Sequence, residues 1–168
     1  MEEIKDFRDI LQGLVEKLHF KMPKVFVMAI EEFEGDFGID FENHQQFFTC
    51  WFFCEFVFVD SKTIPQLMSQ FLDLNGKEKE ILHKISNVIQ GYFEVIRVEG
   101  DEVYLKDLLT DIAYKVDCSD INIKLQKKDL IFAKLVKNFN EKLFFFGTIG
   151  FRTKNKEEIY NEIEEFKK

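Results

Sequence analysis

At 168 residues, the chain has the length of one domain, or of two very small ones. Its residues are 46% hydrophobic and 32% charged, a balance that allows a buried core and disfavours a disordered chain. The net charge at pH 7 is −8, and the longest apolar run, residues 47–59, is shorter than the ~20 residues that span a bilayer, which argues against a membrane protein.

The N-terminal part of the chain has the hydrophobic spacing of helices. Residues 2–18 place their apolar side chains on one stripe, which predicts an amphipathic helix that ends near Pro23. Residues 24–33 predict a second short helix, and the two glycines within 34–40 predict a loop.

The most apolar stretch is CWFFCEFVFV, at residues 50–59. Residues 41–59 predict a largely helical, buried segment, although the FVFV end is equally compatible with a strand. Cys50 and Cys54 fall on one face of such a helix, but structural zinc needs four ligands, so we expect both to pack in the core. Glu55 is expected to have a basic partner, an upward-shifted pKa or a place at the rim.

Two capping patterns mark the next helices. The T-x-x-Q pattern at 63–66 predicts a capping box that opens a helix over 64–74. Asn75 is followed three residues later by Glu78, which predicts the N-cap of a helix over 77–90.

After Gly91 the hydrophobic period changes from helical to two. Residues 92–99 and 102–109, joined at Gly100-Asp101, predict a β-hairpin. Further strands are predicted over 112–117, 130–136 and 142–149. These short strands predict a small, partly closed antiparallel barrel.

The fold class is therefore expected to be α+β, with a helical N-terminal half, a small antiparallel β-barrel-like half and a C-terminal helix. The corresponding regions are 1–91, 92–150 and 151–168, which we expect to form one compact unit.

Several short stretches resemble a widespread group of uncharacterised prokaryotic proteins, many of which carry a cysteine-rich, zinc-binding SEC-C tail. The similar stretches are WFFCE (51–55), KTIP (62–65), FL (71–72), EIL (80–82), YFEVI (92–96), VYLKDLLT (103–110), Val116, Ser119, DLIFAKLV (129–136) and FG (146–147). The resemblance implies the helix-then-barrel layout and no particular reaction.

Two differences from that family matter. The SEC-C cysteines are absent, so its zinc is not expected here. Asp111 and Lys128 stand where the family tends to have glycine, so the turns at these positions are expected to differ in shape.

Charge is unevenly distributed along the chain. Residues 1–120 hold 12 Lys and Arg against 24 Asp and Glu, whereas residues 121–156 hold 9 against 2, a net charge of +7. Basic residues interleaved with phenylalanines on a small barrel are typical of single-stranded nucleic-acid binding, with cations for phosphates and rings for bases. The candidate nucleic-acid residues are Lys124, Lys127, Lys128, Lys134, Lys137, Lys142 and Arg152. A basic face that docks on the acidic N-terminal half is the alternative.

Metal and catalytic signals are weak. Asp36, Asp40 and His44 are weak metal candidates, because their spacing does not match an EF-hand. Glu80 and His83 form a single E-x-x-H, which we interpret as a surface pair on a helix. Phosphate-loop, dinucleotide and nucleophile-elbow motifs are absent, so we predict no catalytic residue, no cofactor-binding residue and no cofactor.

The chain has 21 phenylalanines, and much of their apolar area is expected to be buried in a core or an interface, because Phe has no polar group. Our leading interpretation is a non-enzymatic protein-interaction module whose Phe-rich surface binds a protein partner or a second copy of the chain. The alternative is a nucleic-acid-binding protein that uses the basic barrel. Three cysteines without a signal peptide indicate the reducing cytoplasm.

Overall fold

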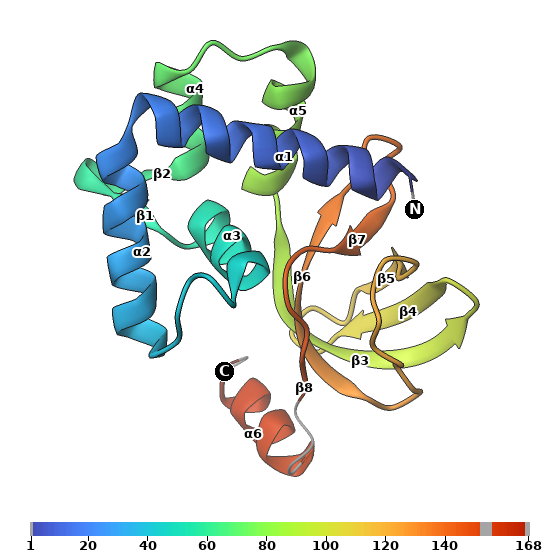
Figure 1. Cartoon of the computed structure of the whole chain (residues 1–168). Coiled ribbons are helices and arrows are strands. Elements are labelled where there is room, and N and C mark those ends of the chain that lie inside the picture. Colours follow the sequence, from blue (N-terminus) through green and yellow to red (C-terminus); the bar gives the residue numbers. More distant parts are fainter. Residues whose placement is uncertain (1, 152–155, 167–168) are drawn as a thin grey trace. The chain divides into compact units, whose positions relative to one another are not determined.

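The computed structural model describes residues 2–151 and 156–166, and its contacts divide the chain into two units, Glu2–Val88 and Ile89–Lys168. The first unit is built mainly of helices, and the second holds a strand barrel followed by a helix (Figure 1). The predicted α+β class, with a helical N-terminal half, a small barrel and a C-terminal helix, is confirmed. Among the helices in the described ranges, none is long and apolar enough to cross a membrane.

The helices of the first unit follow the predicted order. They are α1 (Glu2–Lys21), α2 (Pro23–Phe37), α3 (Gln45–Cys54), α4 (Ile64–Phe71) and α5 (Gly76–Ser86), with a small hairpin of β1 (Val57–Phe58) and β2 (Lys62–Thr63) between α3 and α4. Part of FVFV is therefore a strand. Helix α1 ends at Lys21, and Pro23 begins α2, since a proline in the first helical turn loses no hydrogen bond.

The loop predicted over 34–40 was placed too early. Helix α2 continues through Gly35, because Phe33 and Phe37 both pack against rings of α3. The helix ends at Gly38, whose φ of 63° is the left-handed conformation that glycine adopts at a helix C-terminus.

The predicted capping box at Thr63 and the predicted N-cap at Asn75 are both present. The N–H of Thr63 donates to the side chain of Gln66 at the start of α4, and Asn75 exchanges two bonds with Glu78 at the start of α5. The ends of these helices come earlier than predicted. Helix α5 stops at Ser86 because the following residues already begin the first barrel strand.

Aromatic rings of α2 and α3 fill the interior of the first unit. Phe33, Phe48 and Phe52 are each at most 1% exposed. The ring centroid of Phe33 lies 5.2–5.5 Å from those of Phe47, Phe48 and Trp51, in edge-to-face or tilted arrangements. Such pairs add about 0.5–1.5 kcal/mol each beyond the area they bury, so the rings determine how α2 packs on α3.

The CWFFCEFVFV stretch is thus largely core, as predicted. Cys50 is buried, Cys54 is partly buried, and neither forms a disulfide within the described residues. Glu55 follows the last residue of α3 and is exposed, so this carboxylate lies at the rim.

An ion pair joins α1 to the start of α5. Glu78 is 6% exposed, and its carboxylate accepts bonds from the Lys17 ammonium and the Asn75 N–H. Burial by itself raises the pKa of Glu78, but the bonds from Lys17 and Asn75 lower it more, so the pKa lies below its ordinary value. Ionised Glu78 therefore stabilises the folded unit.

We expect Glu78→Gln to lower the free energy of unfolding by about 1 kcal/mol at pH 7, because it removes a charged hydrogen bond. Since the folded pKa is depressed, this contribution is present above the unfolded pKa and is lost as pH falls through the folded pKa. Urea unfolding of the native protein and the variant, from pH 7 to acidic pH, measures the difference between their free energies of unfolding. A difference that stayed constant at acidic pH would contradict the role of the ion pair.

The second unit is a closed five-stranded barrel with one short added strand. Its strands are β3 (Ile89–Glu99), β4 (Glu102–Asp107), β5 (Ala113–Asp117), β6 (Leu130–Lys137), β7 (Leu143–Phe145) and β8 (Gly150–Phe151). The order around the barrel is β3-β4-β5-β7-β6, and β3 also pairs with β6 to close it. The predicted hairpin is confirmed, with Glu99 opposite Glu102.

Strands β5 and β7 pair in parallel, which corrects the expectation of an antiparallel barrel. Strand β7 runs beside β5 with Leu143 opposite Val116. The long strand β3 makes closure possible, because residues 89–94 pair with β6 and residues 93–99 pair with β4, where the register shifts between Val95 and Arg97. Such a bulge bends a strand and increases its twist.

Alternate residues of the barrel strands point inward and form an apolar core. This core includes Phe93, Val95, Val103, Leu105, Val116, Ile131, Ala133, Leu135 and Phe145.

Helix α6 (Lys156–Phe166) packs on the outside of this barrel. Ile159 is 4% exposed and clusters with Leu108 and Leu130. The Tyr160 hydroxyl donates to the Glu94 carboxylate at 3.2 Å, and burial together with that carboxylate raises the pKa of Tyr160.

Candidate nucleic-acid interface

The strand order of the barrel is that of the oligonucleotide- and oligosaccharide-binding (OB) fold. Strand order β3-β4-β5-β7-β6, closure by the first and fourth strands, and a parallel third and fifth strand define this topology. In OB-fold proteins, ligands bind across the second and third strands and between the loops that follow the first and fourth. These features correspond here to β4, β5 and the β3–β4 and β6–β7 turns.

A row of polar side chains crosses the outer face at this place. Arg97, Tyr104 and Lys115 lie opposite one another on β3, β4 and β5. The Arg97 guanidinium carbon is 3.9 Å from the centroid of the Tyr104 ring, and the Lys115 ammonium is 5.9 Å from it. Both cationic side chains are 55% exposed, so the row offers an aromatic ring between two accessible positive charges.

The registers of neighbouring segments extend this row at both ends. Leu143 at the start of β7 lies opposite Val116 of β5, and the two strands are parallel. Lys142, which precedes Leu143, is therefore level with Lys115, which precedes Val116. At the other end, the N–H of Lys128 donates to the Val95 carbonyl at 2.8 Å, next to the bulge. Two of the predicted lysines therefore border the row. We call Lys128, Arg97, Tyr104, Lys115 and Lys142 the basic row.

Acidic side chains partly neutralise the basic row. Glu99 lies 3.3 Å from Arg97, and Glu102 lies 2.8 Å from Lys115. The hydrogen bond from Lys115 to Glu102 raises the pKa of the Lys115 ammonium, which stays charged at neutral pH. Exposed pairs of this kind contribute only about 0–1 kcal/mol, so a phosphate group can replace these carboxylates.

The remaining predicted nucleic-acid residues are dispersed. Lys124 and Lys127 are exposed in the connection between β5 and β6. Lys137 is exposed at the β6–β7 turn and pairs with Glu141 at 2.9 Å. Lys134 is only 8% exposed, with its ammonium 5.9 Å from the centroid of the Phe132 ring, so it is less accessible than the other predicted lysines. Arg152 lies outside the described residues.

Sequence reasoning missed Arg97, Tyr104 and Lys115. For Arg97 and Tyr104, the sequence did contain a signal that could have identified them. A hairpin with a two-residue turn at Gly100-Asp101 places Arg97 opposite Tyr104 by counting alone. Lys115 could not be added from local pattern, because its position depends on how β5 pairs with β4.

The acidic cluster of the first unit has local structural roles. The Asp40 carboxylate accepts bonds from the backbone and side chain of Asn43 at 2.8 Å, and the backbone bond in particular lowers the pKa of Asp40. The His44 ring lies 2.9 Å from the Asp40 carbonyl oxygen. Within residues 2–151 and 156–166, no group of three His, Cys, Asp or Glu side chains is placed to hold a metal ion, and Asp36 does not complete one.

Most of the described phenylalanines are interior rather than superficial. Those among the exposed large hydrophobic residues are Phe20, Phe37 and Phe71, and Phe20 is 93% exposed. The expected Phe-rich surface is thus reduced to separate rings on α1, α2 and α4.

Comparisons with known proteins do not identify a family for this chain. No family model matches the chain, and no curated protein matches it. Among solved structures, the telomere capping protein Ten1 from Saccharomyces pombe is similar with a TM-score of 0.36 and 12% identity, over 47% of this chain and 80% of the Ten1 chain. A likeness at this level says nothing about the function or partners of this chain.

Proposed function

We propose that this protein is a cytoplasmic, non-enzymatic module that binds single-stranded nucleic acid on the outer face of its barrel. The observation that carries the proposal is the stacking of Arg97 on Tyr104 with Lys115 on the far side, at the ligand-binding position of this barrel topology. The chemistry is complementary to a single strand, because cations attract phosphates and an exposed ring or guanidinium plane stacks on a base.

The dimensions of the basic row indicate a short contact. Neighbouring strands are about 4.8 Å apart, so the path from β3 through β4 and β5 to β7 spans about 14 Å, or two to three nucleotides. With one aromatic ring in the row, we expect one stacked base and little sequence preference.

Salt dependence of binding is the first test. A fluorescent oligothymidylate of about 15 nucleotides is titrated with the protein, and anisotropy is recorded at several salt concentrations. Replacing Arg97 and Lys115 by glutamine should make the slope of log K against log salt about 1.4 units less steep, since each phosphate contact contributes about 0.7. An equal slope, or no binding by the native protein, would remove the proposal.

Removing a competing carboxylate should have the opposite effect. Glu102→Gln frees Lys115 and deletes a negative charge beside the row, so we expect about two- to fivefold tighter binding to the same oligonucleotide. Glu31→Gln makes the same change of net charge on the exposed face of α2 and should leave the affinity unchanged. Equal gains in both variants would show that only net charge matters.

A protein partner or a second copy of the chain is the second candidate, favoured by the 93% exposure of Phe20. A native mass spectrum of untagged protein, purified at low salt, measures subunit number and bound oligonucleotide together. A dimer that Phe20→Glu dissociates would support self-association. A monomer that carries heterogeneous oligonucleotide would support the first proposal.

A further inference from the structure

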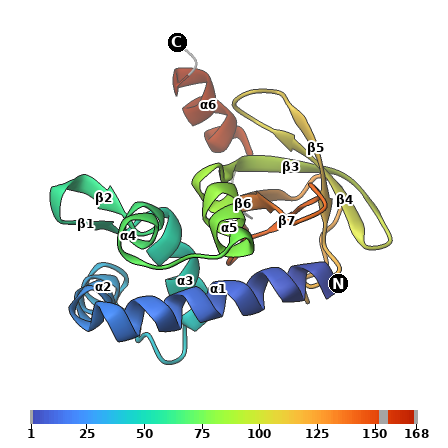
Figure 2. The ribbon, with the colours of Figure 1, turned by 90° about the horizontal axis from the view of Figure 1, so that it is seen from above.

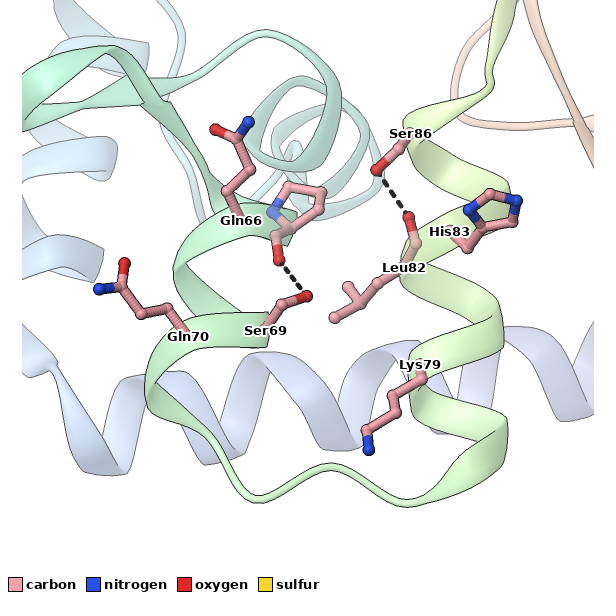
Figure 3. A pocket seen from close by; sticks show the side chains of 8 residues that line it. Gln66, Ser69, Gln70, Lys79, Leu82, His83 and Ser86 are labelled. Carbon is pink, nitrogen blue, oxygen red and sulfur yellow. Dashed lines mark hydrogen bonds between the residues drawn. The ribbon is translucent and has the colours of Figure 1, made fainter.

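The groove between α4 and α5 in the first unit is lined by polar groups that do not converge on one ligand. Lys79 extends across the groove from α5, but Gln66 and Gln70 lie on the side of α4 that faces away from α5 (Figure 3). The hydroxyls of Ser69 and Ser86 donate to carbonyls of their own helices at 2.8 Å. A stronger candidate lies on the second unit.

The outer face of the barrel continues beyond the basic row, toward helix α6. Lys106 follows Tyr104 by two residues on β4, so both side chains lie on the same face, about 7 Å apart along the strand. Glu94 on β3 lies opposite Lys106. Glu94 and Lys106 therefore form the next level of this face, beside the level that holds Arg97 and Tyr104.

Helix α6 brings an aromatic side chain to this next level. The helix lies beside β3 in both views of the ribbon (Figure 1 and Figure 2). Ile159 packs with Leu108 and Leu130 and so anchors α6 on the barrel. The Tyr160 hydroxyl donates to the Glu94 carboxylate at 3.2 Å. Tyr160 is nevertheless 39% exposed, so the packing of α6 leaves it open to solvent.

The charges around Tyr160 suit a base better than a phosphate. The Lys106 ammonium forms an ion pair with the Asp111 carboxylate at 2.9 Å. Glu94 adds a second carboxylate at the same level, so two negative charges stand against one positive charge. This level therefore does not attract a phosphate, whereas an uncharged base can stack on an exposed ring.

We propose, on the basis of the function proposed for the barrel, that Tyr160 is a second base-stacking residue and holds the base next to the one on Tyr104. The phosphates of the bound strand stay on Arg97 and Lys115, and the second base turns from them toward α6. The two levels are about 7 Å apart along β4, which one nucleotide can span, since about 14 Å accommodates two to three nucleotides.

Fluorine NMR of protein labelled with 3-fluorotyrosine tests the stacking directly. The chain has 4 tyrosines, and single Tyr-to-Phe variants assign their signals. Oligothymidylate of about 15 nucleotides should shift the signals of Tyr104 and Tyr160, because a stacked base changes the magnetic environment of the ring. The signal of Tyr114, which packs against the barrel core, should stay in place.

The same spectra distinguish failure of the second stacking residue from failure of the proposed function. A shift of the Tyr104 signal without one of the Tyr160 signal would overturn the role of Tyr160 and leave nucleic-acid binding on the basic row standing. Spectra in which neither signal moves would contradict both.

Two variants of Tyr160 separate stacking from support of helix α6. Tyr160→Ala removes the ring and should weaken binding of the same oligonucleotide at low salt by about five- to tenfold. Tyr160→Phe keeps the ring and loses only the bond to Glu94, so its affinity should stay within about twofold of the native value. Equal losses in the two variants would overturn the proposal.

Salt dependence gives a second readout for Tyr160→Ala. Because Tyr160 contacts a base and no phosphate, the slope of log K against log salt should be the same in this variant as in the native protein. A less steep slope would show that the loss of Tyr160 disturbs the phosphate contacts of the basic row, and would also overturn its assignment as a stacking residue.

Discussion

Replacing Tyr104 by alanine is expected to weaken binding of single-stranded oligothymidylate by about 10- to 100-fold. Loss of a stacking contact costs about 1–3 kcal/mol, and 1.4 kcal/mol corresponds to a factor of ten in affinity. The ring also supports the Arg97 guanidinium at 3.9 Å, so its removal leaves that cation without a fixed position. Fluorescence anisotropy of the labelled oligonucleotide at low salt measures the change.

Tyr104→Phe is the matched control, because it keeps the ring and loses only the hydroxyl. We expect its affinity to stay within about threefold of the native value. Tyr104 lies on the outer face of β4, between the inward-facing Val103 and Leu105, so neither variant disturbs the barrel core. Far-ultraviolet circular dichroism of both variants verifies this. Unchanged binding by Tyr104→Ala would exclude the basic row as the nucleic-acid site.

Phe33→Ala is expected to have the largest effect on stability, a loss of about 3–5 kcal/mol in the free energy of unfolding. Phe33 is 0% exposed, and its ring contacts those of Phe37, Phe47, Phe48 and Trp51. Removal of the ring leaves a cavity that the surrounding rings of α2 and α3 cannot close without breaking their edge-to-face contacts. Urea unfolding followed by circular dichroism measures the loss.

Phe20→Ala is the control for that measurement, since it deletes the same side chain at a position that is 93% exposed. We expect its unfolding free energy to lie within about 0.5 kcal/mol of the native value. Comparable losses in the two variants would contradict the assignment of Phe33 to the core and of Phe20 to the surface.

Several local features of the fold were predictable from the sequence, because neighbouring residues specify them. The capping residues Thr63 and Asn75 mark helix starts, since their side chains satisfy N–H groups within the next turn. The two-period apolar pattern on either side of Gly100 predicted the β3–β4 hairpin and its turn, which brings Glu99 opposite Glu102. The apolar CWFFCEFVFV stretch could only be stable if largely buried, and it lies largely in the core.

Pairings between distant segments could not be predicted in this way. Closure of the barrel joins Ile89 to Leu135, and the parallel pair joins Val116 to Leu143. The hydrophobic pattern of a strand indicates which side faces inward, but many partners satisfy the same pattern. The choice among them depends on the packing of the whole core and on the bulge between Val95 and Arg97.

The same distinction applies to the candidate sites. By itself, the sequence determined that a basic, Phe-containing segment follows an acidic one, and that helices precede a small barrel. Only the tertiary structure decided that Lys134 is buried and that Arg97, Tyr104 and Lys115 form one row. The physical reason is that composition depends on residues one at a time, whereas a binding surface depends on which distant residues backbone pairing and side-chain packing bring together.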